Sequence, residues 1–118
     1  MKIKKEEITR ELIWKFADVR NIPLGWKRIV YYDVATQELR SYLAPSEEWW
    51  EEQEWWKEQK NIFIESFVSP GEFWAGCPLS DEEAGIDENT SEEEAIDIIT
   101  DIYQEIWFDE FEFPEELK

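Results

Sequence analysis

Apolar and polar residues first alternate with a helical period. In residues 6–20 the apolar positions recur at helical spacing, and Pro23 and Gly25 follow as helix-breaking residues. The residues that define this spacing are Ile8, Leu12, Ile13, Phe16 and Val19. The pattern predicts a first helix over 6–20.

The next segment has the composition of paired strands. Residues 27–34 and 38–43 are rich in β-branched and aromatic side chains, and a short polar link at 35–37 separates them. This arrangement predicts a β-hairpin. Lys27, Arg28 and Arg40 make the hairpin basic.

A second helix is predicted to begin after Ser46, which is a good N-cap followed by two glutamates. Aromatic residues recur every seven positions, which favours one helix over 46–68 with a buried aromatic side. These residues are Trp49, Trp56 and Phe63. A competing prediction ends the helix at Asn61 and makes residues 62–68 a third strand, because apolar positions there also alternate. We favour the helix.

The C-terminal half predicts a long irregular loop over 71–89 and then a third helix. Ser91 and Glu94 form a capping-box pattern, and the helix is expected to run to about Phe108. In the acidic tail, Phe111 and Phe113 are spaced as in an extended strand. The sequence therefore predicts an α+β fold, with three main helices packed on a β-hairpin and residues 1–118 forming a single small domain.

Charge changes this picture because it is concentrated in one part of the chain. The formal net charge is −18, yet residues 1–45 contain nine Lys/Arg and six Asp/Glu, whereas residues 46–118 contain three and twenty-four. Residues 61–117 contain no Lys or Arg. Such a field attracts basic proteins and repels nucleic acid. A general adaptation to high salt would spread acid over the whole surface, which the basic first segment does not fit.

Several functional classes are disfavoured by composition. The chain has no histidine, which removes the commonest general base and metal ligand, and Cys77 lies near acidic clusters, without the basic neighbours that activate a thiol nucleophile. Placing Gly85 at the sixth position of an EF-hand loop puts Ser91 at the twelfth, where a glutamate is required. We therefore expect no enzymatic activity, no cofactor and no dedicated metal site.

The expected location is the cytoplasm of a bacterium or an infected host cell. No apolar run approaches a membrane span, the basic N-terminus leads into charged sequence, and a lone cysteine forms no intramolecular disulfide. We expect neither membrane insertion nor direct nucleic-acid binding, because the aromatic residues are interleaved with glutamate rather than with basic residues.

Two predicted helices carry acidic rows opposite their apolar sides. In the last helix, acids four residues apart lie on one side. The apolar side is predicted to centre on Ala95, Ile98, Ile99, Ile102 and Ile106, and Ile96, Tyr103 and Trp107 widen it in one direction. The expected partner-binding acids are Glu93, Asp97, Asp101 and Glu105, with Glu47, Glu51, Glu54 and Glu58 on the second helix. Trp50 and Trp55 border the second row. Either another element covers them, such as the loop around Trp74, or they are exposed anchors for a partner.

In size, acidity and aromatic content, the chain is similar in kind to phage DNA-mimic inhibitors, including some anti-CRISPR and anti-restriction proteins. The resemblance is compositional and transfers no site residues. It implies a non-catalytic inhibitor that presents carboxylates to a basic, nucleic-acid-binding protein. The alternatives are an immunity protein that neutralises a nuclease toxin and an acidic subunit or chaperone of a larger complex. The sequence gives no prediction of whether the protein is a monomer or an oligomer.

Overall fold

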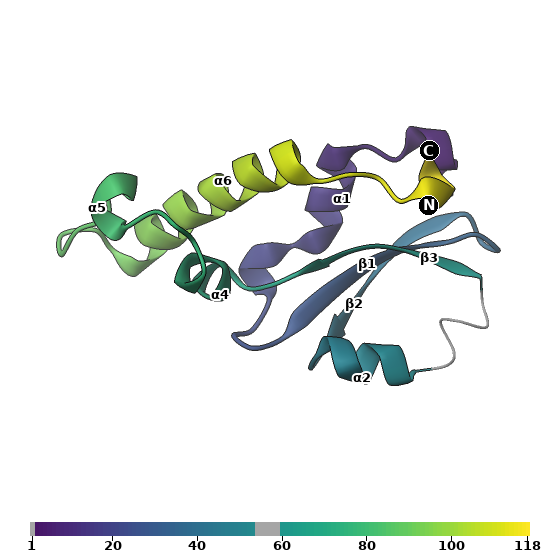
Figure 1. Ribbon diagram of the computed structural model, residues 1–118, viewed down its shortest axis with the longest axis horizontal. Helices are drawn as coiled ribbons and strands as arrows, with labels where there is room; N and C mark the ends of the chain where they lie inside the picture. Colours follow the sequence, from purple (N-terminus) through teal and green to yellow (C-terminus); the bar gives the residue numbers. More distant parts are fainter. Residues whose placement is uncertain (1, 54–59) are drawn as a thin grey trace.

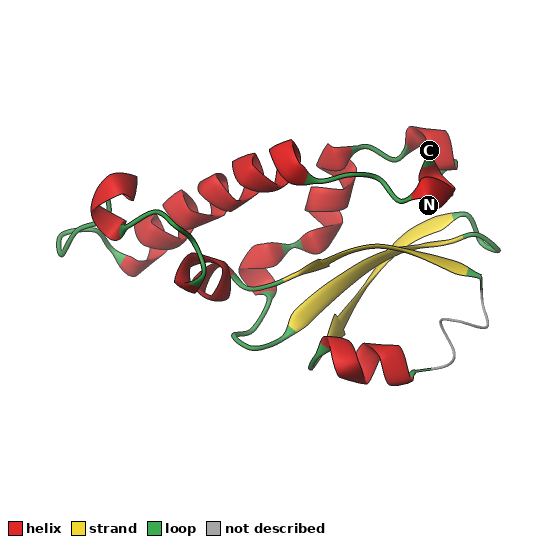
Figure 2. Ribbon diagram, viewed as in Figure 1, coloured by secondary structure: helices red, strands yellow, loops and turns green. Residues whose placement is uncertain are grey.

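The computed structural model describes residues 2–53 and 60–118 of the chain. In this part the fold is α+β, with a three-stranded antiparallel sheet in the order β2-β1-β3 (Figures 1 and 2). The strands are β1 (Lys27–Asp33), β2 (Glu38–Ala44) and β3 (Asn61–Phe67). The helices are α1 (Arg10–Ala17), α2 (Glu47–Glu52), α4 (Pro70–Ala75), α5 (Asp81–Ala84) and α6 (Glu92–Glu110), with 3-10 turns η1 (Lys5–Glu7), η2 (Val19–Asn21) and η3 (Glu115–Leu117).

The predicted α+β class is confirmed, but three main helices on a hairpin is too simple a description. Of the helices in the described residues, only α1 and α6 are longer than six residues, and a third strand is added to the hairpin. The hairpin itself is confirmed, with Lys27 opposite Ala44 and Asp33 opposite Glu38. Its turn is held by the Asp33 carboxylate, which accepts hydrogen bonds from the backbone N–H groups of Ala35 (3.0 Å) and Thr36 (3.3 Å).

The favoured long helix over 46–68 is wrong, and the competing third strand is confirmed. Ser46 does cap α2, accepting a hydrogen bond from the Trp49 backbone N–H at 3.0 Å, but the helix ends at Glu52. Residues 61–67 pair antiparallel with β1 instead, with a register irregularity between Val30 and Tyr31. The edge of β1 that does not pair with β2 carries backbone N–H and C=O groups, and residues 61–67 bond to these groups. The seven-residue spacing of aromatic residues gives no sign of this pairing.

The first predicted helix is shorter than expected at both ends, because α1 begins only after Thr9 and because Asp18 adopts a left-handed backbone conformation, with φ of 42°. Thr9 caps α1 by accepting a hydrogen bond from the Leu12 N–H at 3.2 Å, and the helix ends at Ala17. The Asp18 carboxylate then accepts hydrogen bonds from the Asn21 side-chain amide, both at 2.9 Å. Residues 19–21 therefore form η2 rather than a last helical turn.

The predicted loop over 71–89 contains two short helices. Ser69 caps α4 and Ser80 caps α5, each accepting a backbone N–H hydrogen bond at 3.2 Å. Phe73 packs against the core, with its ring stacked on Tyr103 at a centroid distance of 4.2 Å. In the tail, the Phe111 carbonyl accepts a hydrogen bond from Arg10 at 3.0 Å, so this segment packs near α1 outside the sheet.

Both faces of the sheet carry a buried cluster. Alternate residues of β1 point to opposite faces. Val30 and Tyr32 pack beneath α1 and α6 on what we term the α6 face, and Ile29 and Tyr31 pack against α2 on the α2 face (Figure 1). Trp14 of α1 lies in the α6-face cluster, with its ring centroid 5.2 Å from Tyr103 and 5.8 Å from Phe67. In the described residues no helix is both long and apolar enough to cross a bilayer.

Candidate protein-binding surface

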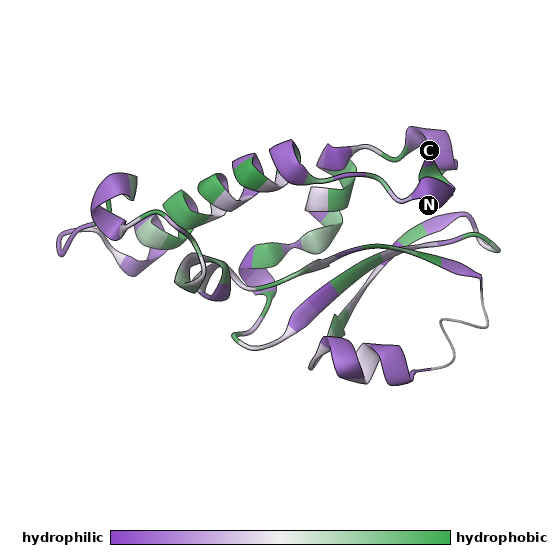
Figure 3. Ribbon diagram, viewed as in Figure 1, coloured by the Kyte–Doolittle hydropathy of each residue, from purple (hydrophilic) through white to green (hydrophobic). Residues whose placement is uncertain are grey.

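Helix α6 presents its acidic row on the outside of the molecule. Ser91 caps the helix by accepting a hydrogen bond from the Glu94 N–H at 3.1 Å, as the capping pattern predicts. Figure 3 shows hydrophobic and hydrophilic residues alternating along the helix. The four predicted acids, Glu93, Asp97, Asp101 and Glu105, are all exposed.

The apolar side of α6 is rotated from its predicted centre. Its buried residues are Ile99, Tyr103 and Trp107. Of the predicted centre, Ile99 is buried, whereas Ala95, Ile98, Ile102 and Ile106 are half-buried. Aromatic contacts explain the rotation, because Tyr103 and Trp107 both pack against Trp14 and Phe67. The acidic row stays exposed despite this shift.

One member of the row has a cationic partner from the N-terminal half. The Asp97 carboxylate forms an ion pair with the Arg20 guanidinium, which η2 places beside α6. No cation pairs with Glu93, Asp101 or Glu105 within residues 2–53 and 60–118. Residues 61–117 contain no cation, but the fold brings Arg20 from the N-terminal half to the Asp97 carboxylate. The other three carboxylates stay unpaired in the described part of the chain.

The second predicted row is described only in part. Glu47 and Glu51 are exposed on α2. Glu54, Trp55 and Glu58 lie outside the described residues. Trp50 is 2% exposed, so it does not present its ring to a partner, and the exposed-anchor alternative is wrong for this residue. Its ring packs instead against Tyr31 and Tyr42, at centroid distances of 5.5 and 5.4 Å.

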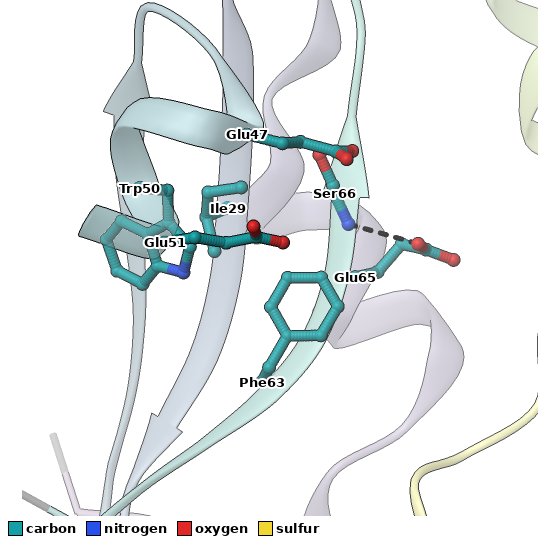
Figure 4. Close-up of a pocket in the computed structure, with 7 residues that line it drawn as sticks. All are labelled: Ile29, Glu47, Trp50, Glu51, Phe63, Glu65 and Ser66. Atoms are coloured by element: carbon teal, nitrogen blue, oxygen red, sulfur yellow. Dashed lines mark hydrogen bonds between the residues drawn. The ribbon is translucent and has the colours of Figure 1, made fainter. Parts of the chain in front are cut away.

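A pocket of about 530 Å³ lies between α2 and β3. Its apolar lining comes from Ile29, Trp50 and Phe63, and its acidic lining includes Glu47 and Glu51 (Figure 4). The remaining lining residues are Glu65 and Ser66. Phe63 is 41% exposed, one of the exposed large apolar side chains of the described residues. Sequence reasoning missed this feature because the favoured helix placed Phe63 on the buried side with Trp49. The competing strand prediction contained the correct signal. In a strand Phe63 points to the face opposite Ile62 and Ile64, and therefore away from the α6 face.

The largest pKa shift among the described residues belongs to a core tyrosine rather than to a surface carboxylate. Burial raises the pKa of Tyr103 to about 12, and the hydrogen bond that its hydroxyl accepts from the Val68 N–H opposes the rise only in part. Burial also raises the pKa of Tyr31. Across the described residues no group of three or more Cys, Asp or Glu side chains is arranged to hold a metal ion.

Comparison with protein-family models, curated proteins and solved structures finds no match to this chain.

Proposed function

We propose that this protein is a non-catalytic acidic inhibitor that binds a basic, nucleic-acid-binding protein and occupies the cleft that receives the phosphate backbone. The observation that carries the proposal is the exposed row of carboxylates along α6, formed by Glu93, Asp97, Asp101 and Glu105. A row of anions on a rigid helix is the feature that a phosphate-binding cleft recognises.

The spacing of the row supports this function. Residues four apart on a helix are separated by a rise of about 6 Å. Phosphates on one DNA strand are separated by about 3.4 Å along the axis, so the carboxylates repeat near the spacing of alternate phosphates. Lysine and arginine side chains in the partner have the reach to absorb the remaining difference.

The energetics of α6 also favour a binding role. Each pair of like charges four residues apart destabilises a helix by roughly 0.2 to 0.5 kcal/mol. Only Asp97 gains a compensating cation in the described part of the structure. Glu93, Asp101 and Glu105 therefore lower the stability of α6 without a compensating contact in the described part of the fold. This is expected of residues selected for contact with a partner.

The inhibitor proposal includes more than one kind of basic partner. A nuclease toxin has the same type of cleft as a defence nuclease, so neutralisation by an immunity protein is the alternative in which the same surface acts on a different target. An acidic subunit or chaperone would instead bind a partner through a contact that is not basic. The identity of the partner separates these classes.

The deciding experiment is a competition titration with a partner identified by affinity capture from the native host. The partner is loaded with labelled DNA or RNA, and this protein is then added. Wild type is expected to displace the nucleic acid, with an association rate that falls steeply as salt increases. The variant Glu93→Gln/Asp101→Asn/Glu105→Gln is expected to displace it poorly.

A matched control changes the same number of charges elsewhere. The variant Glu82→Gln/Glu88→Gln/Glu116→Gln neutralises three exposed acids outside α6 and is expected to displace nucleic acid as wild type does. Equal loss in both variants would mean that net charge acts instead of the row. Binding of wild type while nucleic acid stays fully bound would reject the proposal.

A further inference from the structure

The pocket between α2 and β3 combines two unpaired carboxylates with an exposed aromatic ring. Glu47 and Glu51 are four residues apart on α2, and both side chains extend towards β3 (Figure 4). The structure shows no hydrogen bond or ion pair to either carboxylate from the described residues. Among the described residues, the pocket is therefore negative at these two carboxylates, and no cation neutralises them.

The apolar lining limits what kind of cation fits. Ile29 is fully buried in the sheet, and Trp50 closes the pocket on the α2 side. Phe63 lies opposite Tyr31 in the β1–β3 pairing, so its ring stands on the α2 face and remains 41% exposed. A ligand that fills this space needs an apolar stem for these walls and a positive end for the two carboxylates.

An arginine side chain meets both requirements better than lysine does. Its guanidinium is planar and weakly hydrated, stacks on aromatic rings, and pairs with carboxylates through two parallel hydrogen bonds. A lysine ammonium is a strongly hydrated point charge and gains less from the ring of Phe63. A cavity of about 530 Å³ also has room for one such side chain and part of the backbone that carries it.

We infer that this pocket binds an arginine side chain supplied by the basic partner protein. The inference rests on the proposed function for its source, because a net charge of −18 draws basic proteins to the surface. It assigns the α2 pocket a role that the α6 row does not have. The row supplies long-range attraction along a helix, and the pocket reads one particular side chain at short range.

The test uses the full chain and three short capped peptides that differ at one central residue: arginine, lysine or citrulline. Citrulline keeps the shape of arginine and removes its charge. Binding is followed by two-dimensional NMR of the Phe63 ring and the Ile29 methyl groups. The arginine peptide is expected to give saturable shifts, the lysine peptide to bind roughly two- to fivefold more weakly, and the citrulline peptide to give no saturable shift.

Variants on one helix provide a matched control. Glu47→Gln/Glu51→Gln is expected to abolish saturable binding of the arginine peptide. Glu48→Gln/Glu52→Gln makes the same charge change on exposed positions of α2 that do not line the pocket, and is expected to bind as wild type does. Phe63→Leu keeps an apolar side chain on β3 and is expected to remove the preference for arginine over lysine.

Each outcome separates the pocket from the proposed function. Equal binding of the citrulline and arginine peptides, or equal loss in the two α2 variants, would overturn the arginine site. The α6-row competition result is independent of these measurements, so the inhibitor proposal can stand while the pocket fails. If the arginine peptide binds as expected, Glu47→Gln/Glu51→Gln should also raise the concentration of this protein needed to displace nucleic acid from the partner. An unchanged displacement concentration would show that the partner supplies no arginine to the pocket.

Discussion

The two faces of the sheet differ in how completely they are covered. On the α6 face, the described residues form a buried cluster of thirteen side chains beneath α1 and α6. On the α2 face, the corresponding cluster has four, covered by a helix of six residues. One strand, β1, contributes to both. Among the described residues the larger buried cluster lies on the α6 face, so we expect this face to contribute more to the stability of the fold than the α2 face does.

Two phenylalanines of β3 give the sharpest test of this difference. Phe67 is 0% exposed on the α6 face, and Phe67→Ala is expected to lower the free energy of unfolding by about 3–5 kcal/mol. Phe63 is 41% exposed on the α2 face, and Phe63→Ala is expected to lower it by about 1 kcal/mol or less. Urea denaturation of both variants measures the contrast. Similar losses would show that the two faces contribute equally.

Alkaline pH is expected to destabilise the α6 face through Tyr103. Its pKa is raised to about 12 in the folded protein, against 10.0 for an unperturbed tyrosine, because burial favours the neutral phenol. The resulting stabilisation is complete below pH 10 and is lost as the pH rises towards 12. The loss is on the order of 2 to 3 kcal/mol.

Denaturation midpoints measured from pH 9 to 12 check this expectation. Tyr103→Phe should reduce the slope over that range, leaving the smaller contribution of tyrosines such as Tyr31, whose pKa is also raised by burial. At neutral pH the same variant should lose about 1 kcal/mol, because the Val68 N–H loses its hydrogen-bond acceptor. An unchanged alkaline slope would contradict the assignment to Tyr103.

Hydrogen exchange extends the comparison to the helices themselves. Amides of α2 are expected to exchange through local opening at a lower free energy than amides in the middle of α6, because α2 has fewer buried contacts to lose. Native-state exchange at increasing denaturant separates the two. Opening of both helices at the global unfolding free energy would mean that the α2 face is as firmly held as the α6 face.

The smallest expected effects concern the acidic row. Asp97→Asn removes the ion pair with Arg20. Both side chains are exposed (Arg20 43%, Asp97 57%), so the loss should cost no more than about 1 kcal/mol of stability. Asp101→Asn removes like-charge repulsion and should be neutral or stabilise the protein by a few tenths of a kcal/mol.

A double-mutant cycle with Arg20→Ala tests the pairing. Arg20→Ala and Asp97→Asn are expected to be non-additive, whereas Arg20→Ala and Asp101→Asn are expected to add. A large loss of stability for Asp101→Asn would show that its carboxylate supports the fold, which would weaken its assignment to the partner-binding surface.

Local signals in the sequence were sufficient for several elements. The caps at Ser46 and Ser91, the hairpin over 27–44 and the exposure of the acids on α6 all follow from residues within a few positions of one another. Capping hydrogen bonds span three residues, and helical periodicity repeats within four, so the information lies in the segment itself.

The sequence by itself thus determined the α+β class, the helix starts capped by Ser46 and Ser91, and the side of α6 that faces outward. Only the tertiary structure decided that residues 61–67 form a strand, that Arg20 pairs with Asp97 and that Trp50 is buried while Phe63 is open. Each of these outcomes depends on a partner distant in sequence: the free edge of β1, the position of η2 beside α6, or the tyrosines beneath α2. The local periodicity of the sequence does not indicate these partners, because residues distant in sequence come into contact only when the chain has folded.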